Sequence, residues 1–264
     1  MMFCCRRISV MVNKEKAQLI NCLSELNLTT ARKQYTELAQ QAEVESLSYQ
    51  DFLLSVLEAE CQSRRTRRIE RRLRESRLPI EKSFETFEQK RLPQKVSRQV
   101  KTLLQGEFIN HNENVLIFGN PGSGKTHLTC ALAQQLVRQD KRVYFSTCAL
   151  LLQDLLLAKK DLRLPKLLKK LRRFDAIIID DIGYVQQEKE EMEVLFTLLA
   201  ERYEQGSVMI TSNLPFSKWE KIFKDPMMTA AAVDRIVHHS VILELNIPSY
   251  RINSAKNRKL KEAC

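Results

Sequence analysis

The stretch GNPGSGKT at residues 119–126 constrains this chain more than any other. It directly follows the apolar run VLIF at residues 115–118 and leads into THLTCALAQQLV, whose apolar residues recur at helical spacing. Glycines in such a loop let backbone N–H groups wrap a phosphate, and the N-terminus of the next helix adds partial positive charge. Lys125 is then placed to reach the β- and γ-phosphates, and the Thr126 hydroxyl to bind Mg²⁺. This order of strand, loop and helix predicts a nucleotide-binding site rather than an ordinary glycine-rich turn.

Short apolar runs recur along the second half of the chain, each separated from the next by a stretch with helical spacing. After VLIF they are VYFS, AIIID, VMITS and VILEL, at residues 143–146, 176–180, 208–212 and 241–245. Strands that alternate with helices indicate an α/β fold whose parallel sheet carries helices on both faces. A hydrophobic content of 44% with only six glycines and seven prolines is typical of an ordered, helix-rich protein.

Polar residues follow two of these runs. A carboxylate at the carboxyl end of a strand can hold Mg²⁺ through water, so Asp180 is the expected metal residue together with Thr126. Asp181 is placed to orient an attacking water, although paired acids after a strand can also cap the next helix. Asn213 follows VMITS and could bond that water or the γ-phosphate; an Asn before Leu-Pro is also an ordinary turn residue.

Arg235, in the stretch AAAVDRIVHHS, is the candidate arginine finger. Such a donor stabilises charge on the transferred phosphoryl group and often comes from a neighbouring subunit. The alternative is an ordinary surface arginine. His238 and His239 have no acidic or cysteine partner at ligand spacing, so we interpret them as structural.

The first part of the chain has the pattern of a small all-α domain. Residues 14–77 contain no glycine or proline, and their apolar residues predict three helices. Thr29 or Thr30 is expected to cap a helix that starts at Ala31, and Ser48 to begin the cap of the third helix.

The third helix is expected to run through residues 63–77 and to end before Leu78-Pro79, because the residue before a proline is disfavoured in the α region. We therefore expect a helical domain over residues 1–78 and an α/β domain over residues 79–264. Residues 1–11 are expected to be a disordered extension, since Met2 and Met11 could each serve as the start.

Positive charge is concentrated in the third helix. The chain carries 43 Lys and Arg against 32 Asp and Glu, a net charge of +11, which favours a polyanionic partner. Residues 63–77 hold eight arginines and two glutamates, and at 100° per residue Ile69 and Leu73 point away from most of them. A solvated helix would instead mix Glu and Lys four residues apart, so the pattern favours nucleic acid. The candidate DNA-binding residues of this helix are Arg64, Arg65, Arg67, Arg68, Arg71, Arg72 and Arg74.

Cysteine spacing and apolar run length bear on the compartment. The seven cysteines show no CxxC spacing and indicate reduced thiols rather than a disulfide framework or a zinc site. No run approaches the roughly 18 apolar residues of a membrane span. We expect a cytoplasmic bacterial protein without a membrane partner.

Five motifs together resemble the IstB-like transposition helper ATPases of bacterial insertion sequences, relatives of the DnaC helicase loader in the initiator clade of AAA+ proteins. The motifs are GNPGSGKTHL, FDAIIIDDIGY, MITSNLPFSKW, AAAVDRIVHHS and IPSYR. The resemblance covers residues 80–264, and the helical front end in outline. It implies an AAA+ P-loop core with a five-stranded parallel sheet and no C-terminal lid, preceded by a small all-α domain.

The resemblance also implies site residues for ATP and Mg²⁺. Asp180 and Asp181 match Walker B, Asn213 matches sensor 1, Arg235 a finger acting in trans, and Arg251 a sensor-2-like arginine, although too few residues follow VILEL for the usual lid. The nucleotide would be bound by Gly119, Asn120, Pro121, Gly122, Ser123, Gly124, Lys125, Thr126 and His127.

A second basic stretch, residues 159–174, corresponds to an extra helical insertion that faces the central DNA path in the related multimers. The resemblance suggests that it touches the DNA backbone; a core helix with a basic outer face is the alternative. Its candidate DNA-binding residues are Lys166, Lys169, Lys170, Arg172 and Arg173.

The implied function is ATP-dependent assembly into a homo-oligomer on double-stranded DNA and delivery of that target to a DDE-type transposase. Two alternatives stay open. A helicase loader would grip a helicase with its front end, which the arginine-rich helix argues against. A DNA-binding scaffold would use ATP only as an assembly switch, and Asp181 keeps this possible because Glu, one methylene longer, commonly occupies its place.

Overall fold

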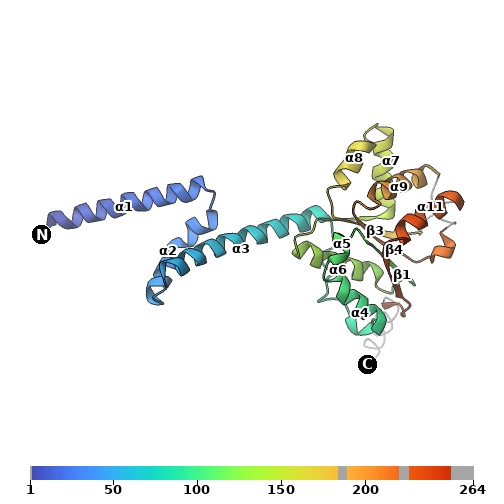
Figure 1. Cartoon of the computed structure of the whole chain (residues 1–264), viewed down its shortest axis with the longest axis horizontal. Coiled ribbons are helices and arrows are strands. Elements are labelled where there is room, and N and C mark those ends of the chain that lie inside the picture. Colours follow the sequence, from blue (N-terminus) through green and yellow to red (C-terminus); the bar gives the residue numbers. More distant parts are fainter. Residues whose placement is uncertain (1, 184–188, 220–225, 251–264) are drawn as a thin grey trace, which may run out of the picture. The chain divides into compact units, whose positions relative to one another are not determined.

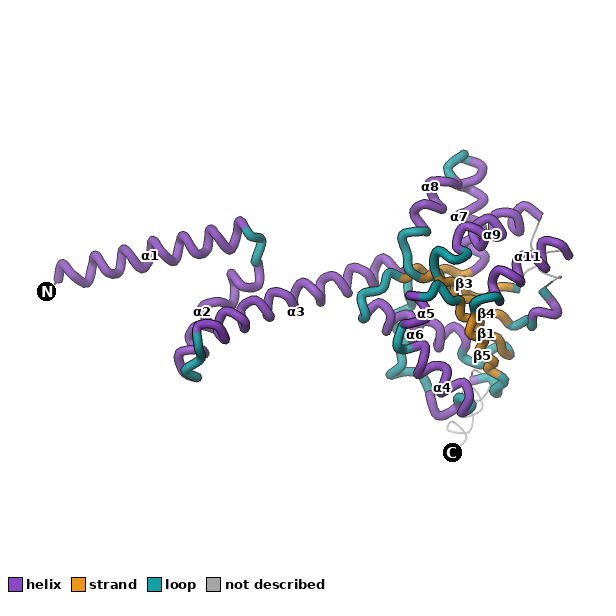
Figure 2. The backbone as a smooth tube through the Cα atoms, viewed as in Figure 1, coloured by secondary structure: helices purple, strands orange, loops and turns teal. Residues whose placement is uncertain are grey.

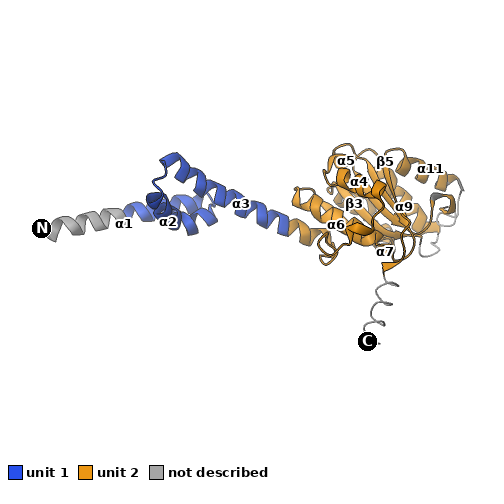
Figure 3. Cartoon of the chain, turned by 90° about the horizontal axis from the view of Figure 1, so that it is seen from below, with its two compact units in different colours: residues 1–70 blue, residues 71–264 orange. Residues whose placement is uncertain are grey.

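A computed structural model of the chain describes residues 2–183, 189–219 and 226–250. Its contacts group into two compact units, residues 1–70 (unit 1) and residues 71–264 (unit 2), coloured separately in Figure 3. The division falls inside the third helix, whereas the sequence placed it after residue 78. The reason is that the last turns of this helix belong to unit 2, where Arg72 makes a 2.8 Å ion pair with Asp140 and Leu78 is buried.

Unit 1 contains the three expected helices, labelled in Figure 1: α1 (Met2–Glu25), α2 (Thr29–Val44) and the first part of α3 (Tyr49–Ser76). Asn27 (φ 55°) and Ser46 (φ 51°) lie in the turns between them. Helix α1 is drawn from Met2, and the expectation of a disordered extension over residues 1–11 stays a prediction. No glycine or proline interrupts the stretch that α1 occupies.

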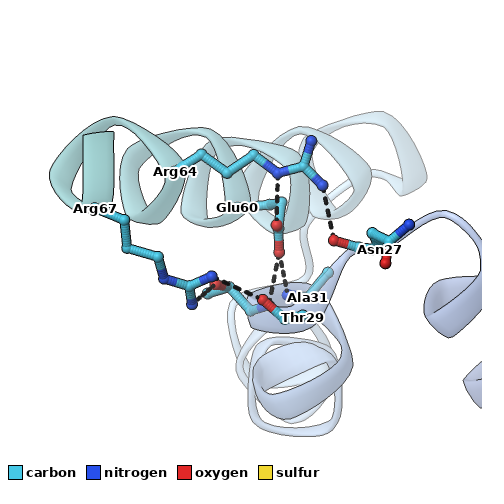
Figure 4. Close-up of polar contacts among 7 residues, drawn as sticks. Asn27, Thr29, Ala31, Glu60, Arg64 and Arg67 are labelled. Carbon is cyan, nitrogen blue, oxygen red and sulfur yellow. Dashed lines mark hydrogen bonds and ion pairs between the residues drawn. The ribbon is translucent and has the colours of Figure 1, made fainter. Parts of the chain in front are cut away.

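A carboxylate from α3 caps the N-terminus of α2 (Figure 4). Glu60, only 3% exposed, accepts hydrogen bonds from the backbone N–H groups of Thr30 (2.6 Å) and Ala31 (3.0 Å), and its other oxygen accepts one from Arg64 Nε (2.8 Å). The expectation that Thr29 or Thr30 caps a helix starting at Ala31 is therefore wrong. The helix starts at Thr29, and a charge from thirty residues away satisfies its free N–H groups.

The start and end of α3 agree with the sequence. The Ser48 hydroxyl accepts a hydrogen bond from the Asp51 N–H (3.2 Å), so Ser48 is confirmed as the cap. The helix continues through the arginine-rich stretch to Ser76, and Arg77 (φ 58°) turns the chain out of it before Pro79.

Unit 2 is built on five parallel strands in the order β2-β3-β4-β1-β5, seen as arrows in Figure 1 and in orange in Figure 2. Their bounds are β1 (Asn114–Gly119), β2 (Val143–Thr147), β3 (Ala176–Ile182), β4 (Ser207–Ser212) and β5 (Ser240–Leu245). All five predicted strands are confirmed, with bounds shifted by no more than two residues. Since β4 lies between β1 and β3, the carboxyl ends that carry Gly119, Asp180 and Asn213 are neighbours.

Helices cover both faces of the sheet, which confirms the predicted α/β architecture (Figure 1). On one face lies α6 (Lys125–Arg138); on the other, α9 (Lys189–Arg202) packs between α7 (Cys148–Lys160) and α11 (Pro226–Val237). The shorter helices are η1 (Gln89–Arg91), α4 (Gln94–Leu103), α5 (Glu107–Asn110), α8 (Leu164–Leu171) and η2 (Phe216–Lys218).

The core lies around this sheet. Leu116, Ile117 and Ile178 on neighbouring strands are fully buried, as expected for a parallel sheet covered on both sides. At the opposite end from the carboxyl edge, the buried Arg202 donates hydrogen bonds to the carbonyls of Phe174, Asp175 and Ser207 and so ties the loops before β3 and β4 together.

Candidate nucleotide-binding site

The loop between β1 and α6 has the conformation that its glycines allow. Gly124 is the residue directly before α6, and it has φ 93°, a left-handed conformation that glycine adopts without strain. A Cβ atom on Gly119 would lie 2.5 Å from the carbonyl oxygen of Leu245 in β5, so only glycine fits between these strands. The loop therefore directs the N-terminus of α6 into the space above the carboxyl edge of the sheet.

Lys125 is held over this loop. Its side chain is buried, and Nζ donates hydrogen bonds to the carbonyl oxygens of Gly119 (2.9 Å) and Asn120 (3.0 Å). An ammonium group at this place supplies a fixed positive charge for a phosphate held by the loop.

Two threonines hold the buried carboxylate of Asp180, which is 4% exposed. The Thr211 hydroxyl donates to Asp180 Oδ1 (2.6 Å), and the Thr126 hydroxyl also hydrogen-bonds this carboxylate. Burial raises the pKa of Asp180 above its ordinary value, and the two hydroxyl contacts oppose this shift. Thr126 and Asp180 thus form the oxygen pair that the sequence predicted for Mg²⁺, while Thr211 was missed because nothing in its local sequence marks it.

Asp181 leaves the regular strand. It has φ 60° and lies where the register between β3 and β4 shifts, a β-bulge that redirects its side chain. The Thr211 hydroxyl accepts a hydrogen bond from the Asp181 N–H (2.8 Å) and thereby holds the bulge. The half-buried Asp181 lines the same cavity as Lys125 and Thr126.

This cavity has a volume of about 370 Å³ and lies entirely within unit 2. One side is formed by the loop from Pro121 to Thr126 and by His127, whereas Gly119 and Asn120, also expected to bind the nucleotide, line a separate hollow. The other side comes from residues that the sequence did not suggest, in the segment before α4 and after β5. These residues are Lys82, Thr86, Phe87, Glu88, Arg91, Ile247 and Tyr250.

The segment before α4 is fastened to α6. The Gln134 side chain donates to the carbonyls of Pro79, Ile80 and Lys82, and the His127 ring lies 2.9 Å from the Ser83 carbonyl oxygen and against the Phe87 ring (5.1 Å). In the sequence, this segment was marked by its position between Pro79 and Pro93. His127 therefore both lines the cavity and positions its wall.

The remaining predicted catalytic residues lie in different places. Asn213 lines the cavity, and its Oδ1 is buried without a hydrogen-bond partner among the described residues. Arg235 lies near the amino-terminal ends of the strands, at the end of the sheet opposite to the cavity. It is half-buried beside Asn114 and Val208, and its guanidinium lies 4.7 Å from the centre of the Phe196 ring. It therefore does not reach the cavity of its own chain. Arg251 lies outside the described residues.

The arginines of α3 do not form one free surface. In unit 1, Arg64 also donates to the Asn27 carbonyl (2.8 Å), and Arg67 donates to the hydroxyl of Thr29 (3.0 Å), as Figure 4 shows. In unit 2, Arg72 is paired with Asp140. Arg71 lies 3.9 Å from Glu75 on the same helix. Exposed side chains belong to all the candidates of this helix except Arg72: Arg64, Arg65, Arg67, Arg68, Arg71 and Arg74.

The second basic stretch forms the end of α7 and the short helix α8. Leu171 is buried against the core and Leu164, Leu167 and Leu168 pack beside it, as the amphipathic pattern predicted. The basic residues on the other side are all exposed: Lys166, Lys169, Lys170, Arg172 and Arg173.

Two further expectations concern metals and membranes. Among the described residues, no group of three or more His, Cys, Asp and Glu side chains could hold a metal ion. The described helices include none with the length and apolar character needed to cross a membrane.

Two solved structures of replication proteins have a similar fold. The DnaC helicase loader matches with a TM-score of 0.51 at 19% identity, over 58% of this chain and 89% of that chain. The replication initiator DnaA, in a complex with AMPPCP and single-stranded DNA, matches with a TM-score of 0.55 at 18% identity, over 70% and 56% of the two chains. These similarities confirm the expected AAA+ fold.

Sequence comparison identifies closer relatives. An insertion-sequence ATP-binding protein of Sinorhizobium fredii is 40% identical over 246 residues, which cover 93% of this chain and 83% of the relative. The ATP-binding protein of insertion sequence IS21 from Pseudomonas aeruginosa is 36% identical, over 89% and 88% of the two chains. The family model of the IstB-like ATP binding proteins matches residues 21–258. The chain therefore belongs to the family of IstB-like ATP-binding proteins.

Proposed function

We propose that this chain is an ATP-hydrolysing transposition helper that multimerises on duplex target DNA and recruits or activates a partner transposase. The observation that carries the hydrolytic part is the single cavity into which Lys125, Thr126, Asp181 and Asn213 all converge. Binding alone would need the loop and its lysine. Hydrolysis also requires groups that orient the attacking water, here a carboxylate and an amide on the far side of the phosphate position.

The residues fit ATP with Mg²⁺. Thr126 and Asp180 supply the hard oxygen donors that Mg²⁺ prefers, and Thr126 lines the cavity together with Lys125. When bound, Mg²⁺ would neutralise charge on the phosphate oxygens. Lys125 binds the β- and γ-phosphates, Asp181 accepts a hydrogen bond from the attacking water and orients it, and Asn213 uses its unpartnered amide oxygen to fix the same water.

The wall of the cavity suits the base. Phe87 and Tyr250 provide aromatic faces for an adenine ring, and Arg91 lies 5.5 Å from the centre of the Tyr250 ring and donates to the Pro248 carbonyl (2.6 Å). Arg91 thus holds Tyr250 in place as a positioning residue.

Arg235 is proposed to act on ATP bound by a neighbouring copy. Its place at the opposite edge of the sheet from the cavity supports this role over a role in its own chain. Its Nη1 is buried and has no hydrogen-bond partner among the described residues. A phosphate oxygen from the neighbouring copy would give this donor the acceptor that it lacks.

Duplex DNA is the proposed polyanion. The exposed arginines of α3 and the exposed basic side of α8 give two separate sets of phosphate contacts in each copy, which an oligomer would repeat along the backbone. The insertion-sequence relatives support transposition over helicase loading, because their names place them in transposable elements.

A comparison of three proteins tests the hydrolytic part: the unchanged chain, Asp181→Asn and Lys125→Ala. We expect Asp181→Asn to bind ATP and assemble on duplex DNA while its turnover falls at least about a hundredfold. Lys125→Ala should bind neither ATP nor DNA as an oligomer. Unchanged turnover in Asp181→Asn would instead leave a scaffold switched by ATP binding, and salt-insensitive DNA binding would argue against the phosphate contacts.

A further inference from the structure

The charge of the side chains changes abruptly within α3, between residues 62 and 63. Residues 34–62, which include most of α2, the turn and the start of α3, contain six acidic residues and no Lys or Arg. Residues 63–77 contain eight arginines. We call residues 34–62 the acidic tip. Apart from Glu60, whose carboxylate is used inside unit 1, its acids are exposed and make no ion pair with any described residue: Glu37, Glu43, Glu45, Asp51 and Glu58.

The acidic tip also exposes an apolar ladder. Tyr49, Leu53 and Leu57 follow one another at four-residue spacing on α3 and are 94%, 56% and 43% exposed. Val44 and Leu54 are also exposed in this segment. Single exposed leucines are common, but a helical row of three is the pattern of a helix face that packs against another helix.

A hollow lies at the end of the ladder, between α2 and α3. Its volume is about 690 Å³, and apolar side chains line most of it, including Ala42, Leu47, Tyr49 and Phe52. Glu43 lies in the same lining. An apolar side chain from a partner helix could enter this hollow while a basic side chain next to it meets the carboxylate.

The ladder stays exposed although α2 is joined to α3 close beside it. Glu60 of α3 accepts hydrogen bonds from the Thr30 and Ala31 N–H groups of α2, and Val56 and Ala31 are buried. The exposed row is therefore free for contacts with another molecule.

We infer that the acidic tip is a docking surface for an amphipathic helix of a partner protein, one with an apolar stripe flanked by Lys and Arg. Apolar contacts with Tyr49, Leu53 and Leu57 would supply affinity, and the unpaired acids would select a basic helix and fix its orientation. Duplex DNA is a poor occupant because its phosphates would meet carboxylates. A second acidic tip would meet the same repulsion. Unit 1 contributes nothing to the cavity of unit 2, so this docking can succeed or fail independently of nucleotide binding.

The test uses the full chain and two labelled synthetic helices of about five turns. Both peptides share one leucine stripe; the remaining positions are Lys in one and Glu in the other. We expect saturable binding of the Lys peptide at moderate salt, measured by fluorescence anisotropy. The Glu peptide should bind at least about tenfold more weakly. The combined variant Leu53→Ser, Leu57→Ser should also weaken the Lys peptide at least about tenfold.

The matched control removes two exposed leucines from unit 2, Leu150→Ser and Leu157→Ser, which are 58% and 61% exposed. This control should bind the Lys peptide as the unchanged chain does, and helical circular dichroism should show that all proteins are folded. Equal loss in both variants, or equal binding of the two peptides, would overturn the proposal. So would a change only in self-association on Leu53→Ser, Leu57→Ser, because the occupant would then be a second copy.

Discussion

At the scale of single residues, Thr211 links the two acids of the candidate site. Its hydroxyl donates to Asp180 and accepts from the Asp181 backbone, so one oxygen orders both the buried carboxylate and the bulge that turns Asp181 into the cavity. The sequence predicted the acids themselves, because a carboxylate pair after an apolar strand is a local pattern. It did not predict Thr211, whose role exists only because β4 pairs with β3.

Replacement of Thr211 by valine should therefore damage both stability and turnover. The side chain is fully buried, and loss of the hydroxyl leaves the Asp181 N–H without its acceptor, at a cost of about 1–3 kcal/mol in the free energy of unfolding. Because the hydroxyl lowers the pKa of Asp180, its loss should raise this pKa further and move the acid limb of turnover to higher pH. Urea unfolding and a pH profile of ATP turnover measure the two effects.

Thr129→Val provides the control for Thr211→Val. Thr129 is also fully buried, but its hydroxyl donates only within α6, to the Lys125 carbonyl (2.9 Å). The control should keep the pH profile of the unchanged chain. If Thr211→Val kept it too, the hydroxyl would not tune Asp180.

At the scale of elements, the junction of α2 and α3 depends on the buried carboxylate of Glu60. Burial alone would raise the pKa of Glu60, but hydrogen bonds from the Ala31 N–H, the Arg64 guanidinium and the Thr30 N–H outweigh it and hold the pKa below its ordinary value. A lowered folded-state pKa means that the contribution to stability is present above the ordinary value and is lost as the pH falls through the folded-state pKa.

We expect Glu60→Gln to lower the free energy of unfolding of unit 1 by about 1–2 kcal/mol near neutral pH. The difference from the unchanged chain should shrink as the pH falls below the ordinary glutamate value. Thermal melts followed by circular dichroism at several pH values measure this, with the exposed neighbour Glu58→Gln as the control. A constant difference at all pH values would mean that the charge of Glu60 is not what caps α2.

Three arginines of the arginine-rich part of α3 bond residues far away in the sequence, although two of them, Arg64 and Arg67, are also exposed. The charge count of the sequence could predict a basic helix, but not that Arg64 and Arg67 would bond the turn before α2 and the start of α2, or that Arg72 would pair with Asp140. Those partners lie between 37 and 68 residues away along the chain, beyond any local pattern. The exposed members are the ones that can contact phosphates.

Combined replacement of Arg65, Arg71 and Arg74 by alanine should therefore weaken duplex binding for every sequence and reduce the slope of log affinity against log salt by roughly 2 to 3. Nucleotide binding and the melting temperature should stay unchanged. The comparison variant Arg64→Ala, Arg67→Ala should instead lower the melting temperature. Binding titrations at several salt concentrations and thermal melts separate the two groups; an unchanged salt slope in the first variant would remove α3 from the DNA interface.

At the scale of the whole molecule, the strand order determines which residues can cooperate. The P-loop, Asp180 and Asn213 follow strands that are neighbours in the sheet, and they share one edge. The alternation of strands and helices predicted that the strands run parallel, so that their carboxyl ends lie at the same end of the sheet, but it does not determine which strands are neighbours. The cavity wall from Lys82 to Arg91 was not predictable, since its position depends on side-chain bonds from α6 to an irregular segment.

The same strand order places Arg235 at the end of the sheet opposite to the cavity, so the proposed function requires the finger to come from a neighbouring copy. We expect Asp181→Asn and Arg235→Ala each to be inactive alone and to regain activity when mixed with ATP and duplex DNA. In a mixed oligomer, intact Asp181 from one variant faces intact Arg235 from the other at roughly a quarter of the interfaces. Turnover of the mixture at constant total protein measures this. A mixture as inactive as its components would place Arg235 outside the reaction, whereas activity of Arg235→Ala alone would show that no finger is needed.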